Sequence, residues 1–141
     1  MTLYCSSQAD IAAAAQVLAQ GQLLAFPTET VYGLGADAGQ EAAVMAIYAA
    51  KGRPTDHPLI VHIAQASDAH RFADPIPGFA KRLMDAHWPG PLTLILPRRA
   101  GVAEASAAHQ NSIGLRCPAH PVAQALLRSA QTLGVMGVSG P

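Results

Sequence analysis

Short apolar runs alternate with helical patterns along the chain, and this alternation restricts the fold more than any other feature of the sequence. The runs expected to form strands cover residues 23–26, 59–63, 92–96, 113–117 and 135–138. The segments expected to form helices cover residues 7–20, 41–50, 77–87 and 121–133. Because strands and helices interleave, the sequence predicts an α/β domain with a mixed, twisted sheet.

Residues at the ends of the helical segments support these boundaries. Ser6 or Ser7 can cap the first helix, and Gly21 can end it. Pro77 and Pro121 suit the first turns of the third and fourth helices, because a backbone N–H at that position would have no partner within the helix.

Two segments have the composition of loops. Glycines at positions 33, 35 and 39 predict a loop, and their Gly-X-Gly-X-X-X-Gly spacing only approximates a dinucleotide-binding fingerprint. Residues 101–111 are small and polar, which predicts a mobile loop. A dinucleotide-binding domain built on the glycines is therefore an alternative that their spacing disfavours.

The composition restricts the partners. Charged residues make up 13% of the 141 residues, and nine Lys and Arg balance nine Asp and Glu. Non-specific binding of nucleic acids depends on clustered cations, so any phosphate chemistry must come from local charge. No apolar run approaches the roughly 20 residues that cross a membrane, and the N-terminus lacks a signal-peptide pattern. We expect a cytoplasmic protein without a membrane partner, in which Cys5 and Cys117 are buried, reduced thiols.

The densest local charge lies in Lys51-Gly52-Arg53-Pro54, between a predicted helix and a predicted strand. A lysine offers a compact charge to a phosphate, and an arginine adds a planar fork for two oxygens. A solvated helix end, whose cations complement the helix dipole, explains the same residues without a ligand. His57 follows Asp56 in this loop and can line the same site. No GxxxxGK[ST] phosphate loop exists in the sequence, so an ATP site must be built differently.

Polar side chains also follow or interrupt the predicted strands. Thr28 and Thr30 come directly after the first strand, where hydroxyls can either face a ligand crevice or stabilise a turn. His62 lies in an apolar strand and faces either a pocket or the core. Arg116 also lies in an apolar strand and needs a partner or a ligand, because an unpaired buried charge is unfavourable. Ser112 precedes it by four residues and shares its face.

Several of these motifs, in this order, resemble the Sua5/YrdC/YciO family of L-threonylcarbamoyladenylate synthases. The matching segments are residues 26–35 (FPTETVYGLG), 50–54 (AKGRP), 58–62 (PLIVH), 88–93 (WPGPLT) and 115–118 (LRCP). The resemblance covers essentially the whole chain. It implies one YrdC-like domain over residues 1–141, with a twisted mixed β-sheet flanked by helices around a large cavity.

The resemblance also implies a reaction and its site. Such enzymes combine L-threonine, bicarbonate and ATP into threonylcarbamoyl-AMP and pyrophosphate, and transferase proteins then make t6A at position 37 of tRNA. The tRNA is thus an indirect partner, and Mg²⁺ is expected with the ATP. By similarity, ATP would be bound by Lys51, Arg53, His57 and Ser112, of which Lys51 and Arg53 would be catalytic. L-threonine would be bound by Thr30, His62, Arg116 and Gly140.

The chain departs from the family pattern at its end. Members carry a Ser-Xaa-Asn motif, usually as Pro-Ser-Ala-Asn, whereas this chain ends at Pro141, where that motif would begin. We therefore expect a domain that is incomplete at its C-terminus and binds ATP poorly. An inactive fragment is one alternative to the synthase. A non-catalytic module that binds RNA, double-stranded RNA included, is another, although the scarce aromatic residues disfavour base stacking.

Overall fold

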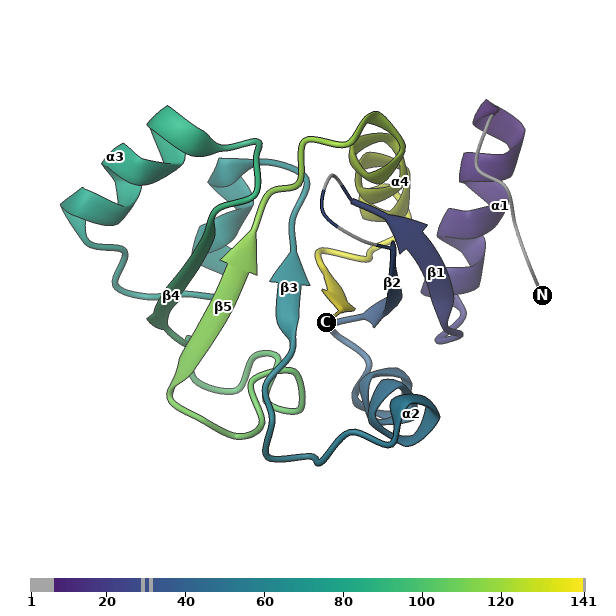
Figure 1. Cartoon of the computed structure of the whole chain (residues 1–141), viewed down its shortest axis with the longest axis horizontal. Coiled ribbons are helices and arrows are strands. Elements are labelled where there is room, and N and C mark those ends of the chain that lie inside the picture. The colour runs from purple at the N-terminus through teal and green to yellow at the C-terminus, as the bar shows by residue number, and fades with distance from the viewer. Residues whose placement is uncertain (1–6, 29, 31, 141) are drawn as a thin grey trace.

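The fold is described from a computed structural model that covers residues 7–28, 30 and 32–140 (Figure 1). Its helices are α1 (Gln8–Ala19), α2 (Glu41–Lys51), the 3₁₀ helix η1 (Ala66–Arg71), α3 (Gly78–His87) and α4 (Pro121–Gln131). Its strands are β1 (Leu24–Pro27), β2 (Tyr32–Asp37), β3 (Ile60–His62), β4 (Thr93–Pro97), β5 (Ser112–Arg116) and β6 (Val138–Gly140). The predicted helices are confirmed, with the side chain of Ser7 capping α1, whereas η1 was not predicted.

The six strands form one mixed sheet in the order β1-β2-β6-β3-β5-β4. The pair β3 and β5 runs parallel, and the other neighbouring pairs run antiparallel. The predicted α/β class with a mixed sheet is therefore confirmed. In Figure 1 the arrowheads of β3 and β5 point the same way, and α2 lies near the opposite ends of these two strands.

The helices cover the two faces of the sheet unequally. One face carries Val61 and Leu115 and packs against α3 and η1. The same face near β2 packs against α2. The opposite face, which carries Phe26 and Val138, packs against α1 and α4. Towards β4 this second face is less covered, since Ile95 is 74% exposed.

The predicted glycine loop is wrong at two of its three positions. Gly33 and Gly35 lie inside β2, and Gly39 lies in the turn that follows. A Cβ at position 35 would lie 2.6 Å from Cε1 of Phe26 and 2.8 Å from Cγ1 of Val138. Glycine is required there by close packing rather than by a turn. A dinucleotide-binding loop at these glycines is therefore excluded.

Two further segments differ from the prediction. The last strand is β6, so residues 135–137 precede it and only Val138 of the predicted run 135–138 belongs to it. The 101–111 segment forms successive turns, and its middle is buried, with Ser106 fully so. Its small side chains allow close packing.

The remaining expectations concern the cysteines and membranes. Cys117 is a buried free thiol, as predicted, and Cys5 lies outside the described residues. Among the described helices, none has both the length and the apolar character required to cross a bilayer.

Candidate functional site

His62 and Arg116 are the last residues of the two parallel strands β3 and β5. They are register partners in the β3–β5 pair, so their side chains lie on the same face. His62 is 2% exposed and Arg116 is 6% exposed. The parallel pairing therefore brings a buried imidazole and a buried guanidinium to one edge of the sheet.

Arg116 is oriented by neutral oxygens. Its Nη1 donates to the hydroxyl of Thr30 at 3.0 Å, and its Nε donates to the carbonyl of Gly90 at 3.3 Å. The hydroxyl of Thr30 also lies 3.1 Å from that of Thr28. These contacts connect the segment after β1 to the end of β5, 86 residues apart in sequence. An oriented guanidinium can bind a carboxylate by donating two parallel hydrogen bonds to it.

His62 is held from two sides. Its Nδ1 lies 3.2 Å from the carbonyl of Val138, and because a carbonyl only accepts, Nδ1 carries the hydrogen. The rings of Phe26 and His62 meet nearly at right angles, with their centroids 5.3 Å apart. A Cβ at position 140 would lie 3.4 Å from Cε1 of His62, so Gly140 lets the backbone approach the ring. The four residues predicted to bind L-threonine thus lie next to one another.

The basic loop, which we define as residues 51–58, starts where α2 ends. Gly52 ends the helix in the left-handed conformation, with φ of 61°. Arg53 donates from Nε to the carbonyl of His57 at 3.2 Å and from Nη2 to that of Pro58 at 2.7 Å. The side chains of Lys51 and His57 are exposed, and His57 lies 3.8 Å from the carboxylate of Asp56. Arg53 therefore folds the loop, while Lys51 extends into solvent.

Ser112 lies at the other end of β5 from Arg116. It is the first residue of that strand and is half-buried. The two residues are four positions apart in the strand, which places their side chains on one face about 13 Å from each other. Because β3 and β5 are parallel, Ser112 and the basic loop, which precedes β3, lie at the same edge of the sheet. The residues predicted to bind ATP and those predicted to bind L-threonine therefore lie at opposite ends of the β3–β5 pair.

The structure also reveals polar residues that the sequence did not single out. Tyr48 lies on the buried face of α2 and donates its hydroxyl to the carbonyl of Ala105 at 3.0 Å. Burial raises the pKa of Tyr48, and the nearby charge of Arg53 opposes that increase. Ser106 and Ser139 are fully buried and share a short hydroxyl–hydroxyl hydrogen bond. The sequence showed no sign of these contacts, because Tyr48 belongs to the apolar pattern of α2 and residues 101–111 are mostly small.

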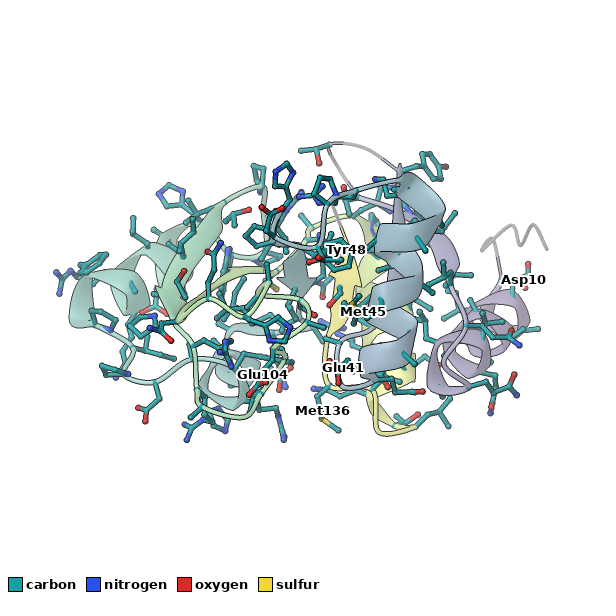
Figure 2. The ribbon with its side chains drawn as sticks, turned by 90° about the horizontal axis from the view of Figure 1, so that it is seen from below. Asp10, Glu41, Met45, Tyr48, Glu104 and Met136 are labelled. Carbon is teal, nitrogen blue, oxygen red and sulfur yellow. The ribbon has the colours of Figure 1, made fainter. Side chains whose placement is uncertain are left out.

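Hollows of about 330, 310 and 320 Å³ are lined by described residues. The first is lined by residues that include Glu41 and Glu104, which lie near each other in Figure 2. Within the described part of the chain, the residues lining these hollows include none of those predicted for the site. Of the predicted residues, His62, Arg116, Ser112 and Gly140 share the face of the sheet that also carries Ile95.

The described residues contain no group of three or more His, Cys, Asp or Glu side chains placed to hold a metal ion.

Comparison of sequences places these residues in a known context. The profile of the Sua5–YciO–YrdC family, described as "Telomere recombination", matches residues 16–139. The threonylcarbamoyl-AMP synthase of Bacillus subtilis is 50% identical over 121 residues, which are 85% of this chain and 35% of that protein. The enzyme of the same name from Pyrococcus abyssi is 46% identical over 118 residues, or 84% and 35% of the two chains. This chain thus spans about a third of the length of these relatives.

Solved structures agree with the sequence matches. Sua5 of P. abyssi in complex with L-threonine superposes with a TM-score of 0.91 at 41% identity, over 96% of this chain and 38% of that one. E. coli YciO superposes with a TM-score of 0.83 at 25% identity, over 96% of this chain and 64% of that one. Full-length HypF, at 16% identity and a TM-score of 0.76, shares the fold.

Proposed function

Because the chain belongs to the Sua5/YciO/YrdC family, we propose that it is part of a threonylcarbamoyl-AMP synthase. The proposed reaction consumes L-threonine, bicarbonate and ATP. The observation that carries the proposal is the contiguous set formed by Thr30, His62, Arg116 and Gly140, in a chain similar to a Sua5 solved with L-threonine.

L-threonine would bind at the ends of β3 and β5. The guanidinium of Arg116, already oriented by Thr30 and Gly90, would pair with the substrate carboxylate. The hydroxyl of Thr30 and the imidazole of His62 are within the same set and would complete the polar contacts. Gly140 would leave room for the ligand beside the ring, because a Cβ there would approach Cε1 of His62 to 3.4 Å.

ATP would bind at the other end of β3 and β5. Lys51 and Arg53 would contact its phosphates, with His57 and Ser112 beside the nucleotide. Mg²⁺ would arrive with the triphosphate and neutralise part of its charge. The roughly 13 Å between the ends of β5 is of the order of the length of an amino acid joined to a nucleotide phosphate. The two ends of the β3–β5 pair can therefore align both substrates.

The chemistry requires positioning more than covalent help from the protein. The amine of L-threonine attacks bicarbonate, and loss of water gives an N-carboxylated threonine. One oxygen of that new carboxylate attacks the α-phosphorus of ATP, and the bond to the β-phosphate oxygen breaks, so that pyrophosphate leaves. Lys51 and Arg53 would stabilise the charge on the phosphates as that bond breaks. Enclosure would protect the N-carboxylated intermediate from water.

The adenylate product would serve proteins that transfer its threonylcarbamoyl group to tRNA. This chain would therefore act on tRNA indirectly, in the cytoplasm where tRNA is modified.

Release of pyrophosphate tests the proposal on this chain. The 141-residue protein is incubated with ATP and Mg²⁺, with and without L-threonine and bicarbonate. Release that depends on both co-substrates and is lost in a Lys51→Ala variant would support the proposal, even at the slow rate that weak binding of ATP predicts. Release that is independent of L-threonine would contradict the proposed substrate. No release, together with no binding of L-threonine in calorimetry, would contradict the proposed function of this chain.

A further inference from the structure

The hydroxyl of Tyr48 makes one specific contact inside an apolar cluster. Tyr48 is 2% exposed, and its hydroxyl donates to the carbonyl of Ala105 at 3.0 Å. Figure 2 shows the Tyr48 side chain between α2 and the middle of the molecule. A phenylalanine would fill the same apolar space, so the hydroxyl contributes this hydrogen bond and little else. The contact joins α2 to the 101–111 segment, 57 residues away in sequence.

The backbone of Tyr48 holds the beginning of the basic loop. Its carbonyl accepts from the amide of Arg53 at 3.0 Å, and the amide of Gly52 also bonds to it. Burial raises the pKa of Tyr48, and the positive charge of Arg53 opposes that increase. A shift of Tyr48 would therefore move the first residues of the loop.

The 101–111 segment also holds the end of the basic loop. The amide of Leu59, which directly follows the loop, donates to the carbonyl of Ser106 at 2.8 Å. The hydroxyl of Ser106 is bonded to that of Ser139 in β6. Two consecutive residues, Ala105 and Ser106, thus receive contacts from α2, from the end of the loop and from the central strand.

The same segment leads directly to Ser112. Just before β5, the carbonyls of Gln110 and Asn111 accept from Nε and from the amide of Arg98, at 2.8 and 2.7 Å. The segment is therefore fixed at its end as well as at its middle. The position of Ser112 relative to the basic loop depends on this segment.

We propose that Tyr48, through the carbonyl of Ala105, positions the basic loop relative to Ser112 for a polyphosphate ligand. Tyr48 is a positioning residue in this scheme, because its hydroxyl is buried against Ala105. The identity of the ligand rests on the proposed function, in which ATP occupies that end of the sheet. The ordering of the loop by Tyr48 rests on the hydrogen bonds alone.

Two measurements on Tyr48→Phe test the proposal. Hydrogen exchange by mass spectrometry, without ligand, should show faster exchange in residues 52–59 and unchanged exchange in α4. Titration with ATP and Mg²⁺ should show binding weakened about threefold to tenfold, the loss that one net hydrogen bond supports. The affinity for L-threonine should stay unchanged, since its residues lie at the other end of the strands.

A second variant and a control separate positioning from general loss of stability. Ser106→Ala should speed exchange in the same residues, because it removes the second attachment of the 101–111 segment. Leu126→Val, in the cluster between α1 and α4, should lower the thermal midpoint without changing ATP affinity. A drop in ATP affinity for Leu126→Val equal to that for Tyr48→Phe would overturn the proposal.

The outcomes distinguish this inference from the proposed function. Unchanged exchange in residues 52–59 of Tyr48→Phe would overturn the positioning role, whatever the parent binds. Faster exchange with unchanged ATP affinity would show that the positioning of the loop by Tyr48 does not affect ligand binding, and this would overturn the proposal. Failure of the parent chain to bind ATP would overturn the ligand assignment and the proposed function together, independently of the exchange result.

Discussion

Burial divides the candidate residues into two groups with different uses in experiments. His62 and Arg116 are almost fully buried, so a substitution at either position changes packing as well as ligand contacts. Arg53 bonds two carbonyls of its own loop, so its removal also disturbs the loop. Lys51 is exposed at the end of α2. Lys51 therefore gives the clearest test of a charge that acts on the ligand.

Lys51→Ala should reduce kcat/KM for ATP by about 100-fold or more, because a charge that stabilises departing phosphate acts mainly in the transition state. The thermal midpoint should stay within a degree or two, as expected for an exposed substitution. Steady-state pyrophosphate release measures the first effect, and thermal unfolding measures the second. Lys81→Ala, at another exposed lysine, is the matched control. Equal rates for both variants would remove Lys51 from the mechanism.

At the scale of elements, β2 and α2 carry the most specific constraints. Strand β2 contains a glycine where Phe26 and Val138 leave no space for a side chain. Helix α2 presents Tyr48 to the 101–111 segment and ends at the basic loop. Both elements fix how neighbouring segments pack, and each can be tested by one substitution.

Gly35→Ala should destabilise the fold by about 1–3 kcal/mol, the usual cost of overpacking a close contact. The new methyl group would overlap Phe26 and Val138, which both contact His62. Urea denaturation followed by circular dichroism measures the loss. Gly114→Ala is the control, since its Cβ would meet Thr93 at an ordinary 3.5 Å. Similar stabilities for the two variants would argue against the close packing of β2.

Tyr48 should make the free energy of unfolding pH-dependent in alkaline solution. Burial raises its pKa in the folded state above the ordinary value of 10.0. The unfolded chain therefore loses this proton first, so the contribution is fully present below pH 10 and is lost as pH rises towards the folded pKa. Tyr48→Phe should remove that part of the decline.

The measurement is urea denaturation of the parent and of Tyr48→Phe between pH 9 and pH 11. The difference in their unfolding free energies should shrink as the pH rises, at up to about 1.4 kcal/mol per pH unit. A difference that stays constant over this range would show that the phenol titrates alike in both states.

At the scale of the whole molecule, three apolar clusters hold the sheet and its helices together. The cluster between α1, α4 and the β1–β2 end of the sheet includes Phe26 and Val138, both of which contact His62. Packing far from the ligand residues thus determines where the buried imidazole lies.

Leu126→Ala should reduce the free energy of unfolding by about 2–5 kcal/mol, because Leu126 is fully buried and its removal leaves a cavity. Leu133→Ala makes the same chemical change at a side chain that is 42% exposed and should cost much less. Chemical denaturation of both variants gives the comparison. Equal losses would mean that the cluster between α1 and α4 does not bear the stability that its burial indicates.

The sequence by itself determined the fold class, the helices and the ordered motifs of the family. Apolar periodicity and helix-capping residues act over a few neighbours, so Ser7 and Pro121 could be interpreted without tertiary information. The candidate site residues came from charge in unusual settings, as at Arg116, and from the family resemblance. The roles of these residues in binding ATP and L-threonine remain predictions.

Tertiary structure decided the features that depend on residues distant in sequence. The glycines of β2 indicated a turn because a sequence does not reveal that Phe26 and Val138 crowd position 35. The buried contacts of Tyr48 and Ser106 were missed because their partners lie 57 and 33 residues away. The residues predicted to bind ATP and those predicted to bind L-threonine lie at opposite ends of β3 and β5, and this arrangement depends on the parallel pairing of the two strands. Local patterns cannot determine such pairings, because the contacts that stabilise them form only when the chain has folded.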